Sequence, residues 1–259
     1  MDRLYLVVPC YNEEEVLPET VRRLTDKLRR MEEKGLVSGD SRILLVDDGS
    51  RDRTWELICG FHRENPVVSG LKLSRNRGHQ NALVAGLMTA RELCDITISL
   101  DADLQDDIEV LDQFVEAYHK GAQIVYGVRS ARDTDTAFKR STAMGFYGLM
   151  KKMGVDIVSN HADYRLMSKK ALDCFSGYHE VNLFLRGIVP LIGFPTAVVT
   201  YERSERFAGE SKYPLKKMLS FAWDGITSFS TKPLSLITGI GVGIGFLSGL
   251  GLLAALICL

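Results

Sequence analysis

The first half of the chain alternates short apolar segments with longer amphipathic ones, and this alternation constrains the fold more than any other feature. Segments typical of buried strands are residues 4–9, 42–48, 67–74, 96–101, 123–128 and, later, 197–201. Segments typical of helices are residues 13–34, 52–62, 81–93 and 108–119. Strands that alternate with helices form a mostly parallel sheet with helices on both faces. We therefore predict an α/β domain over residues 1–213.

Polar residues follow four of these predicted strands, and the carboxyl ends of parallel strands meet at the edge where such sheets bind ligands. Tyr11 could offer its ring to a base, and Asp48 could accept a hydrogen bond from a base or a ribose hydroxyl. Each is also ordinary turn chemistry when taken alone. No G-x-G-x-x-G follows the first strand and no G-x-x-x-x-G-K-[ST] occurs, which disfavours a dinucleotide site and a P-loop.

Asp101 and Asp103 follow the strand-like segment 96–100 and are the strongest candidates for chemistry. On a regular strand, side chains two residues apart point to the same side. Two converging carboxylates repel each other, so we expect a cation between them. Mg²⁺ and Mn²⁺ fill their remaining positions with water and phosphate oxygens. The sequence therefore predicts a metal site for a diphosphate substrate, with a solvated acidic loop as the alternative.

Two later segments also carry charge that could meet a substrate. Arg203, Arg206 and Lys212 lie in a polar loop after the last predicted strand, where they could contact phosphate oxygens or form a solvated cluster. Asp163 stands two residues before Arg165. The two could form a structural ion pair, or Asp163 could act as a base or an orienting group on the acceptor side.

Residues 233–259 contain no charged side chain. At about 1.5 Å per residue, a helix of this length reaches roughly 40 Å, enough to cross a hydrocarbon core of about 30 Å. A buried helix of a soluble protein is the alternative. Gly241, Gly245 and Gly249 repeat at the G-x-x-x-G spacing, so the span could support a homo-oligomer. The segment runs to the last residue, and we expect membrane sequence to continue beyond it.

The charge distribution favours a membrane partner over a nucleic acid. Residues 214–232 predict an amphipathic juxtamembrane helix that carries Lys216 and Lys217 and ends at Lys232. Cations before a span favour the cytoplasmic side, so we expect the catalytic domain there. The formal net charge of −1 provides no overall basic field for nucleic acid. Five cysteines without C-x-x-C spacing indicate neither a zinc site nor a disulfide framework.

Six separated motifs together resemble the inverting family-two glycosyltransferases. They are VVPCYNEEEVL from residue 7, VDDGS from 46, SLDADLQD from 99, YGVRSARD from 126, ADYRLMS from 162 and RFAGESKY from 206. The chain looks most like the polyprenyl-phosphate group, which includes dolichol-phosphate mannose synthase and the bacterial undecaprenyl-phosphate glucosyltransferases. The resemblance covers nearly the whole chain and implies a Rossmann-like domain of the GT-A type followed by a transmembrane helix.

The resemblance also implies roles for the matching residues. The nucleoside would be held by Pro9, Tyr11, Glu13, Val46 and Asp48. The diphosphate and metal would be held by Asp101, Ala102 and Asp103, with Asp101, Asp103 and Gln105 as metal ligands. Phosphates of donor or acceptor would meet Arg129, Arg206 and Lys212, and the residues expected to be catalytic are Asp103, Asp163 and Arg206. The family usually has proline after the Gln-Asp pair, whereas Asp107 and Ile108 follow here and could alter the start of the next helix.

The reaction implied by the resemblance is an inverting transfer of a single sugar to undecaprenyl or dolichyl phosphate, with Mg²⁺ or Mn²⁺. We expect a UDP-sugar as donor rather than a GDP-sugar. No Q-x-x-R-W element is present, which disfavours polymerisation. Two other functions stay open: a sugar-1-phosphate nucleotidyltransferase, which typically opens with a basic Gly-rich loop absent here, and a non-catalytic membrane-tethered nucleotide-sugar-binding protein.

Overall fold

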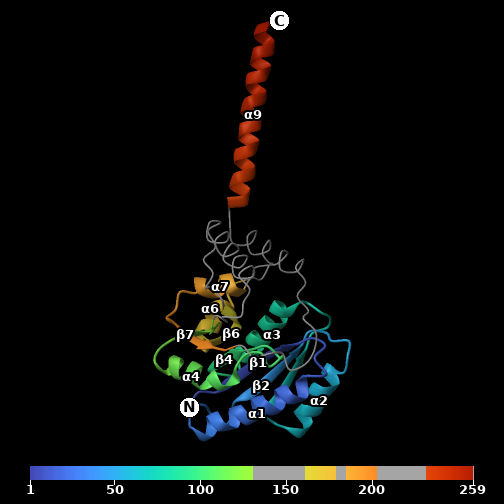
Figure 1. The fold of residues 1–259 in the computed structure, drawn as a ribbon, viewed down its shortest axis with the longest axis vertical. Helices are drawn as coiled ribbons and strands as arrows, with labels where there is room; N and C mark the ends of the chain where they lie inside the picture. Colours follow the sequence, from blue (N-terminus) through green and yellow to red (C-terminus); the bar gives the residue numbers. More distant parts are fainter. Residues whose placement is uncertain (131–160, 179–184, 203–231, 259) are drawn as a thin grey trace. The chain divides into compact units, whose positions relative to one another are not determined.

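The computed structural model describes residues 1–130, 161–178, 185–202 and 232–258. The chain divides into two units, one of residues 1–135 and 158–212 and the other of residues 136–157 and 213–259. The described part of the second unit is one helix, α9 (Lys232–Cys258). The first unit is the α/β domain that the sequence predicts (Figure 1).

A seven-stranded sheet forms the centre of the described part of the first unit, in the order β3-β2-β1-β4-β6-β5-β7. The strands are β1 (Leu4–Cys10), β2 (Arg42–Asp47), β3 (Val68–Lys72), β4 (Ile96–Ser99), β5 (Ile124–Arg129), β6 (His161–Ser168) and β7 (Thr196–Tyr201). Neighbouring strands are parallel except where β6 pairs with β4 and β5. The amino end of β6 therefore lies at the edge where the other strands have their carboxyl ends.

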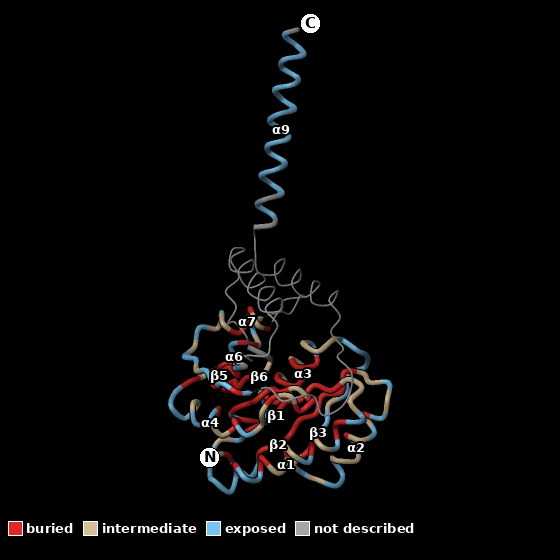
Figure 2. The backbone as a smooth tube through the Cα atoms, viewed as in Figure 1, coloured by how far each residue is buried: buried red, intermediate tan, exposed pale blue. Residues whose placement is uncertain are grey.

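Helices cover both faces of this sheet. On one face, α1 (Leu17–Glu33), α2 (Thr54–Glu64) and α4 (Leu111–His119) contribute Leu24, Ile58 and Phe114 to a common buried core. On the other face, α3 (His79–Arg91) comes so close that a Cβ at Gly86 would lie 2.5 Å from Cγ1 of Val7. Figure 2 shows the buried strands running between these layers.

Two short helices lie beside α3. Helix α6 is Lys169–Phe175, and the Lys169 ammonium donates to the carbonyl of Arg91 at the end of α3, at 2.8 Å. Helix α7 is Leu185–Leu191, and its first N–H, from Leu185, donates to Oε1 of Gln80 at 2.9 Å. The first turn of α3 thus fixes the start of α7.

The largest error in the sequence prediction is strand β6, which the sequence analysis left unassigned. Its residues alternate poorly between apolar and polar types, and it buries the guanidinium of Arg165, which is 1% exposed. Strands are predicted from the alternation of apolar and polar residues, and a buried charged residue interrupts that pattern, so the strand is not recognised. Strand β6 lies between β4 and β5 and runs antiparallel to both, so one antiparallel strand is inserted in an otherwise parallel sheet.

The segment after the metal motif also departs from the predicted helix of residues 108–119. It begins as a 3₁₀ turn, Ile108–Val110, before α4 starts at Leu111. The carboxylate of Asp107 accepts the N–H of Glu109 at 2.9 Å and caps this turn. An aspartate at this position therefore gives a stable start to the segment.

Among the described residues, one stretch is long and apolar enough to cross a membrane. It is Ile237–Ile257, in helix α9. Its large apolar side chains are exposed, for example Leu252 at 68%. By length and composition this agrees with the predicted transmembrane segment at 233–259. The predicted juxtamembrane helix at 214–232 lies outside the described residues, apart from Lys232 at the start of α9.

Candidate functional site

The loops after β1 and β2 are tied together by hydrogen bonds. The Asn12 N–H donates to Oγ of Ser50 at 3.0 Å, and the Arg51 N–H donates to Oδ1 of Asn12 at 2.9 Å. Asn12 adopts the left-handed conformation, with a φ of 53°, which turns the chain sharply after the strand. The predicted nucleoside residues Tyr11 and Glu13 flank this turn.

Pro9 and Val46 are partners in the β1–β2 register, next to the ends of both strands. They place two predicted nucleoside residues side by side at the carboxyl edge. The Glu13 N–H donates to Oγ1 of Thr54 at 2.9 Å, which holds this loop against the start of α2. The edge of β1 and β2 is therefore a fixed platform.

Asp48 is nearly buried and holds two loops together. Its carboxylate accepts the backbone N–H of Arg77 at 2.7 Å and of Gly78 at 2.9 Å. Gly49 beside it has a φ of +66°, and a Cβ there would lie 2.5 Å from the carbonyl carbon of Arg75. Asp48 thus positions the segment that leads into α3, and a contact with a nucleoside stays a prediction.

The metal motif lies beyond its strand. Strand β4 ends at Ser99, so the prediction that Asp101 and Asp103 share one face of a regular strand is wrong. The chain turns at Leu104, whose φ is 57°, and the Gln105 N–H donates to Oδ1 of Asp103 at 3.1 Å. This turn, rather than strand alternation, positions the two carboxylates and the predicted ligand Gln105.

Side chains of helix α1 contact the loop that contains Asp101 and Asp103 and the segment that follows it. Oγ1 of Thr20 donates to the carbonyl of Ala102 at 2.7 Å. Lys27 is 1% exposed and its ammonium contacts Asp112 at 2.8 Å and Glu109 at 3.3 Å. These contacts fix Ala102, between the two aspartates, and the segment of residues 109–112 that follows them.

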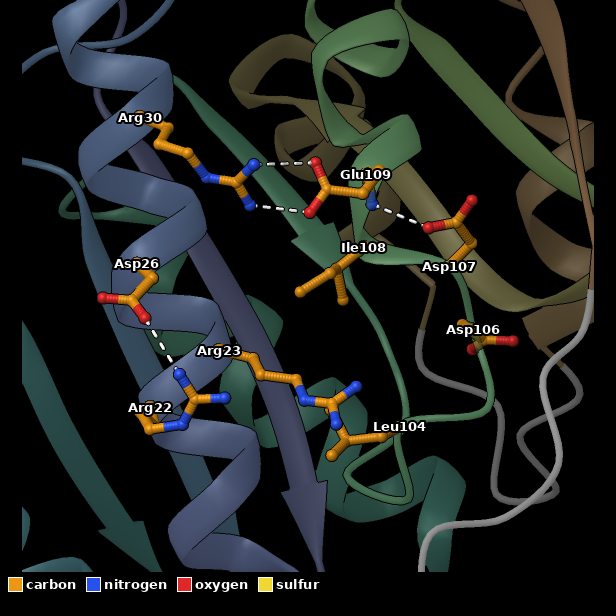
Figure 3. A pocket seen from close by; sticks show the side chains of 9 residues that line it. All are labelled: Arg22, Arg23, Asp26, Arg30, Leu104, Asp106, Asp107, Ile108 and Glu109. Atoms are coloured by element: carbon orange, nitrogen blue, oxygen red, sulfur yellow. Dashed lines mark hydrogen bonds and ion pairs between the residues drawn. The ribbon is translucent and has the colours of Figure 1, made fainter.

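A hollow of about 330 Å³ lies between α1 and this loop, and Figure 3 shows the side chains that line it. Its lining residues are Arg22, Arg23, Asp26, Arg30, Leu104, Asp106, Asp107, Ile108 and Glu109. Arg30 reaches across to Glu109 at 2.6 Å, and Arg22 pairs with Asp26 at 3.2 Å. One of these ion pairs lies within α1 and the other joins α1 to Glu109, so the hollow is lined by residues that hold α1 against the loop.

The aspartates fit a divalent cation. Burial raises the pKa of Asp101 to about 6; His79 opposes this, while the negative charges of Asp106, Asp103 and Asp163 add to it. A cation would relieve this accumulation of negative charge. The described residues contain no group of three or more His, Cys, Asp or Glu side chains that could hold a metal. Two aspartates with water and phosphate oxygens suit Mg²⁺ or Mn²⁺, which need few protein ligands.

Asp163 lies at the amino end of β6, on the same edge. The antiparallel register of β4 and β6 ends where Ser99 pairs with Arg165, two residues before Asp101 and two residues after Asp163. Oγ of Ser99 donates to the Asp163 carbonyl at 2.5 Å. The acceptor-side candidate and the metal motif are therefore neighbours across two strands.

Three cationic side chains surround the Asp163 carboxylate. Oδ2 lies 3.5 Å from Nε2 of His79, and Oδ1 lies 3.6 Å from Nε of Arg186 and 3.8 Å from Nη2 of Arg165. His79 also lies 3.7 Å from Oδ1 of Asp101. His79 and Arg186 were missed by the sequence reasoning. The position of His79 after the third strand and Gly78 was a usable signal, whereas nothing local marked Arg186.

These contacts move two pKa values. Burial would raise the pKa of Asp163, but the contact with His79 and the charges of Arg186, His79 and Arg165 hold it well below its usual range. Burial would lower the pKa of His79, but the contact with Asp163 and the charges of Asp101 and Asp163 raise it to about 9. Asp163 is thus an ion-paired carboxylate beside an imidazolium.

Arg129 ends β5 and is tied to the metal loop. Its Nε donates to the Tyr201 hydroxyl at 3.2 Å, and that hydroxyl donates to Oδ1 of Asp106 at 2.5 Å. Nη2 of Arg129 lies 3.6 Å from the same oxygen. The predicted phosphate contacts Arg206 and Lys212, with Arg203, lie outside the described residues.

Residues 5–175 match the family model described as Glycosyl transferase family 2. The chain belongs to glycosyl transferase family 2. Membership confirms the family that the sequence motifs indicate, and it makes the protein a glycosyltransferase. It also favours sugar transfer over the nucleotidyltransferase and non-catalytic alternatives.

Curated relatives match this family-two chain over most of its length. The uncharacterized glycosyltransferase YkoT of Bacillus subtilis (strain 168) is 56% identical over 254 residues, which are 98% of this chain and 75% of YkoT. The bactoprenol glucosyl transferase of Shigella phage SfV is 40% identical over 250 residues, which are 95% of this chain and 78% of that protein.

A solved structure gives the same fold. The mannosyltransferase PcManGT from Pyrobaculum calidifontis, in complex with GDP-Man and Mn²⁺, aligns with a TM-score of 0.53 at 14% identity, over 95% of this chain and 81% of that one. The family-two chain therefore has the Rossmann-like GT-A fold predicted from its motifs.

Proposed function

We propose that this family-two glycosyltransferase transfers one sugar from a nucleotide sugar to the phosphate of a polyprenyl phosphate at the cytoplasmic face of a membrane, with inversion. The observation that supports the proposal most is that the same chain contains two kinds of feature. Asp101 and Asp103 lie at the ligand-binding edge of the sheet, and a later helix contains an apolar stretch of 21 residues. A lipid acceptor explains why a domain for a soluble nucleotide sugar is attached to such a helix. The bactoprenol glucosyl transferase of Shigella phage SfV supports this acceptor class.

On the donor side, the nucleoside would lie over the edge of β1 and β2, against Pro9, Tyr11, Glu13, Val46 and Asp48. The diphosphate would follow towards Ala102 and Arg129, with a divalent cation held by Asp101, Asp103 and Gln105. When bound, this cation supplies positive charge that neutralises the departing nucleoside diphosphate. The protein contributes a loop fixed by α1, so little reorganisation is needed as charge develops.

On the acceptor side, the nucleophile is a phosphate oxygen that is already anionic near neutral pH. It attacks the anomeric carbon from the side opposite the leaving group; the new bond joins sugar to phosphate, and the bond to the nucleoside diphosphate breaks. Such a nucleophile needs positioning more than deprotonation. Asp163, paired with cations, would therefore orient groups rather than remove a proton.

The membrane orientation follows from the cations around α9. Lys216, Lys217 and Lys232 precede the apolar stretch, and cations in that position favour the cytoplasmic side. We also propose that Arg206 and Lys212, which precede the same stretch in the chain, contact donor or acceptor phosphates. Nucleotide sugar would arrive from the cytosol and meet a phosphate that cannot leave the bilayer plane.

A donor panel tests the proposal. Detergent-solubilised protein would be incubated with undecaprenyl phosphate, Mn²⁺ or Mg²⁺, and each of several labelled UDP- and GDP-sugars. We expect one UDP-sugar to label the lipid with a single sugar in the inverted anomeric configuration, read by mass spectrometry and NMR. Polymeric product, retained configuration, or transfer from GDP-sugars alone would each contradict the corresponding part of the proposal.

A further inference from the structure

We propose that Tyr201 is a positioning residue for Arg129, the arginine placed beside the donor diphosphate in the proposed reaction. The Tyr201 hydroxyl keeps Arg129 from closing an ion pair with Asp106, so that the guanidinium stays available to phosphate oxygens. Tyr201 itself touches no substrate. The inference rests on the proposed function and adds a residue to its donor side.

Arg129 and Tyr201 lie at the ends of neighbouring strands. They are partners in the parallel register of β5 and β7. The backbone N–H and Oγ of Ser130 both donate to the Tyr201 carbonyl, at 2.9 and 3.1 Å. The main chain of Tyr201 therefore fixes the end of β5, while its side chain meets the guanidinium that this strand end carries.

The Tyr201 hydroxyl lies between a cation and an anion. It accepts the Nε–H of Arg129 at 3.2 Å and donates to Oδ1 of Asp106 at 2.5 Å. Nη2 of Arg129 lies 3.6 Å from the same carboxylate oxygen, which is too long for a hydrogen bond. The hydroxyl thus occupies the carboxylate oxygen that a direct ion pair with Arg129 would use.

Burial strengthens the attraction between these two charged groups. The side chain of Asp106 is 1% exposed, whereas that of Arg129 is 31% exposed. Because little water screens a carboxylate in this position, it attracts a neighbouring guanidinium more strongly than an exposed carboxylate would. Without the hydroxyl we expect Arg129 to move onto Asp106. A guanidinium held there in a bidentate pair presents fewer of its five N–H groups to a ligand.

Other aromatic side chains hold the Tyr201 ring in place. It meets the Tyr164 ring edge-on, with the centroids 5.2 Å apart, and Tyr164 packs on Phe114 at 4.7 Å. The Tyr164 hydroxyl donates to the Asp107 carbonyl at 2.9 Å, so it holds the same loop without a contact to Arg129 among the described residues. Replacing either tyrosine by phenylalanine removes the hydroxyl and leaves the ring packing intact.

A double-mutant cycle between Tyr201 and Arg129 tests the inference, with sugar transfer to undecaprenyl phosphate as the readout. Tyr201→Phe should lower kcat about tenfold or more, because a small displacement of a group that contacts the reacting substrate is costly. Adding Tyr201→Phe to Arg129→Ala should change kcat little, since the group to be positioned is already gone. The KM for undecaprenyl phosphate should stay within about twofold, because the contact lies on the donor side.

Two further variants separate positioning from a structural role. Tyr164→Phe should have the same effect in the wild-type and in the Arg129→Ala background, because its hydroxyl holds the loop independently of Arg129. Tyr118→Phe is the matched control and should leave kcat and both KM values unchanged. Tyr118 is a half-buried tyrosine of α4, and its neighbour His119 contacts Asp2 at 2.9 Å, before the start of β1 and away from the ligand-binding edge.

Calorimetric titration gives a readout that does not need turnover. UDP and GDP would each be titrated with and without Mn²⁺, and the variants would be compared with the nucleotide that the wild type binds more tightly. Tyr201→Phe should weaken this binding about tenfold, as expected for a lost charge-assisted contact, and should have little effect in the Arg129→Ala background.

Three results would overturn the inference. They are normal kcat and nucleotide binding in Tyr201→Phe, an undiminished effect of Tyr201→Phe in the Arg129→Ala background, and a rise in the KM for undecaprenyl phosphate alone. With each of them the wild type would still transfer sugar to the lipid phosphate, so the proposed function would stand. If the wild type transferred no sugar, the proposed function would fail, and the binding cycle would still decide whether Tyr201 acts through Arg129.

Discussion

Asp103→Ala is expected to reduce turnover to below about one per cent of the wild-type rate, because removing one preorganised electrostatic group from an active site commonly costs a hundredfold or more. Asp103 is nearly buried, and together with Asp101 it is the carboxylate pair that fits a divalent cation. Asp103→Asn should fail equally, although its amide oxygen can still accept the Gln105 N–H and preserve the turn. The measurement is initial rate at saturating Mn²⁺, with the fold checked by circular dichroism.

Asp107→Asn is the matched control for this pair of variants. Asp107 lies in the same loop, but its carboxylate caps the 3₁₀ turn through the Glu109 N–H. Asparagine caps helix starts about as well as aspartate, so this variant should keep near-normal turnover. Full activity of the wild type in excess chelator, or an active Asp103→Asn protein, would show that the reaction needs no metal at this site.

Arg165→Met is expected to separate stability from function. Methionine fills a similar buried volume without the Nε and Nη2 donors of Arg165, which have no hydrogen-bond partner among the described residues. Asp163 keeps His79 and Arg186 as counter-charges. Removing one partner of a buried ion pair is strongly destabilising when the other charge is left uncompensated, but Asp163 would still have two cationic neighbours. We expect the free energy of unfolding to be unchanged or higher, while kcat/KM for the acceptor falls about tenfold or more.

Urea unfolding and acceptor kinetics on the same preparation measure both quantities. Arg165→Lys serves as the comparison, because it keeps a charge without the planar fork. A strongly destabilised Arg165→Met protein would indicate that the guanidinium is a structural group. Normal acceptor kinetics in a stable Arg165→Met protein would show that the reaction does not need the Arg165 guanidinium.

The sheet and its helices were predictable from sequence because apolar periodicity reports burial directly. The segments around Leu6, Leu45 and Ile98 are continuous apolar runs that lie at the centre of the sheet, as parallel strands require. Strand β6 escaped this reasoning because Arg165 and Asp163 interrupt its apolar pattern. Predictions from local sequence patterns are expected to fail where charged residues are placed for function rather than for the fold.

The metal motif was found for a reason that the structure corrects. Asp101 and Asp103 come together through the turn at Leu104 and the brace from Thr20, not through strand alternation. Spacing alone cannot distinguish these two cases, because both leave the aspartates at the end of an apolar strand. The role of the two aspartates as metal ligands stays a prediction, whereas the local geometry predicted for them is wrong.

The proximity of the three cationic residues to Asp163 could not be predicted from the sequence. His79, Arg165 and Arg186 are far apart in the chain and meet through the order of strands and the docking of α7 on α3. Each looks like an ordinary surface charge when read in its own segment. The antiparallel pairing of β6 with β4 brings Asp163 to the same edge of the sheet as Asp101, where His79 contacts both carboxylates.

The proposed reaction depends most on the chemical nature of the acceptor, which one comparison measures directly. The same protein, donor and metal would be offered undecaprenyl phosphate and the matching undecaprenol, at equal concentrations in the same detergent. We predict that labelled sugar appears on the phosphate and stays at background on the alcohol, because the phosphate oxygen is the nucleophile. Equal transfer to the alcohol, or transfer to neither lipid with any nucleotide sugar, would contradict the proposed reaction.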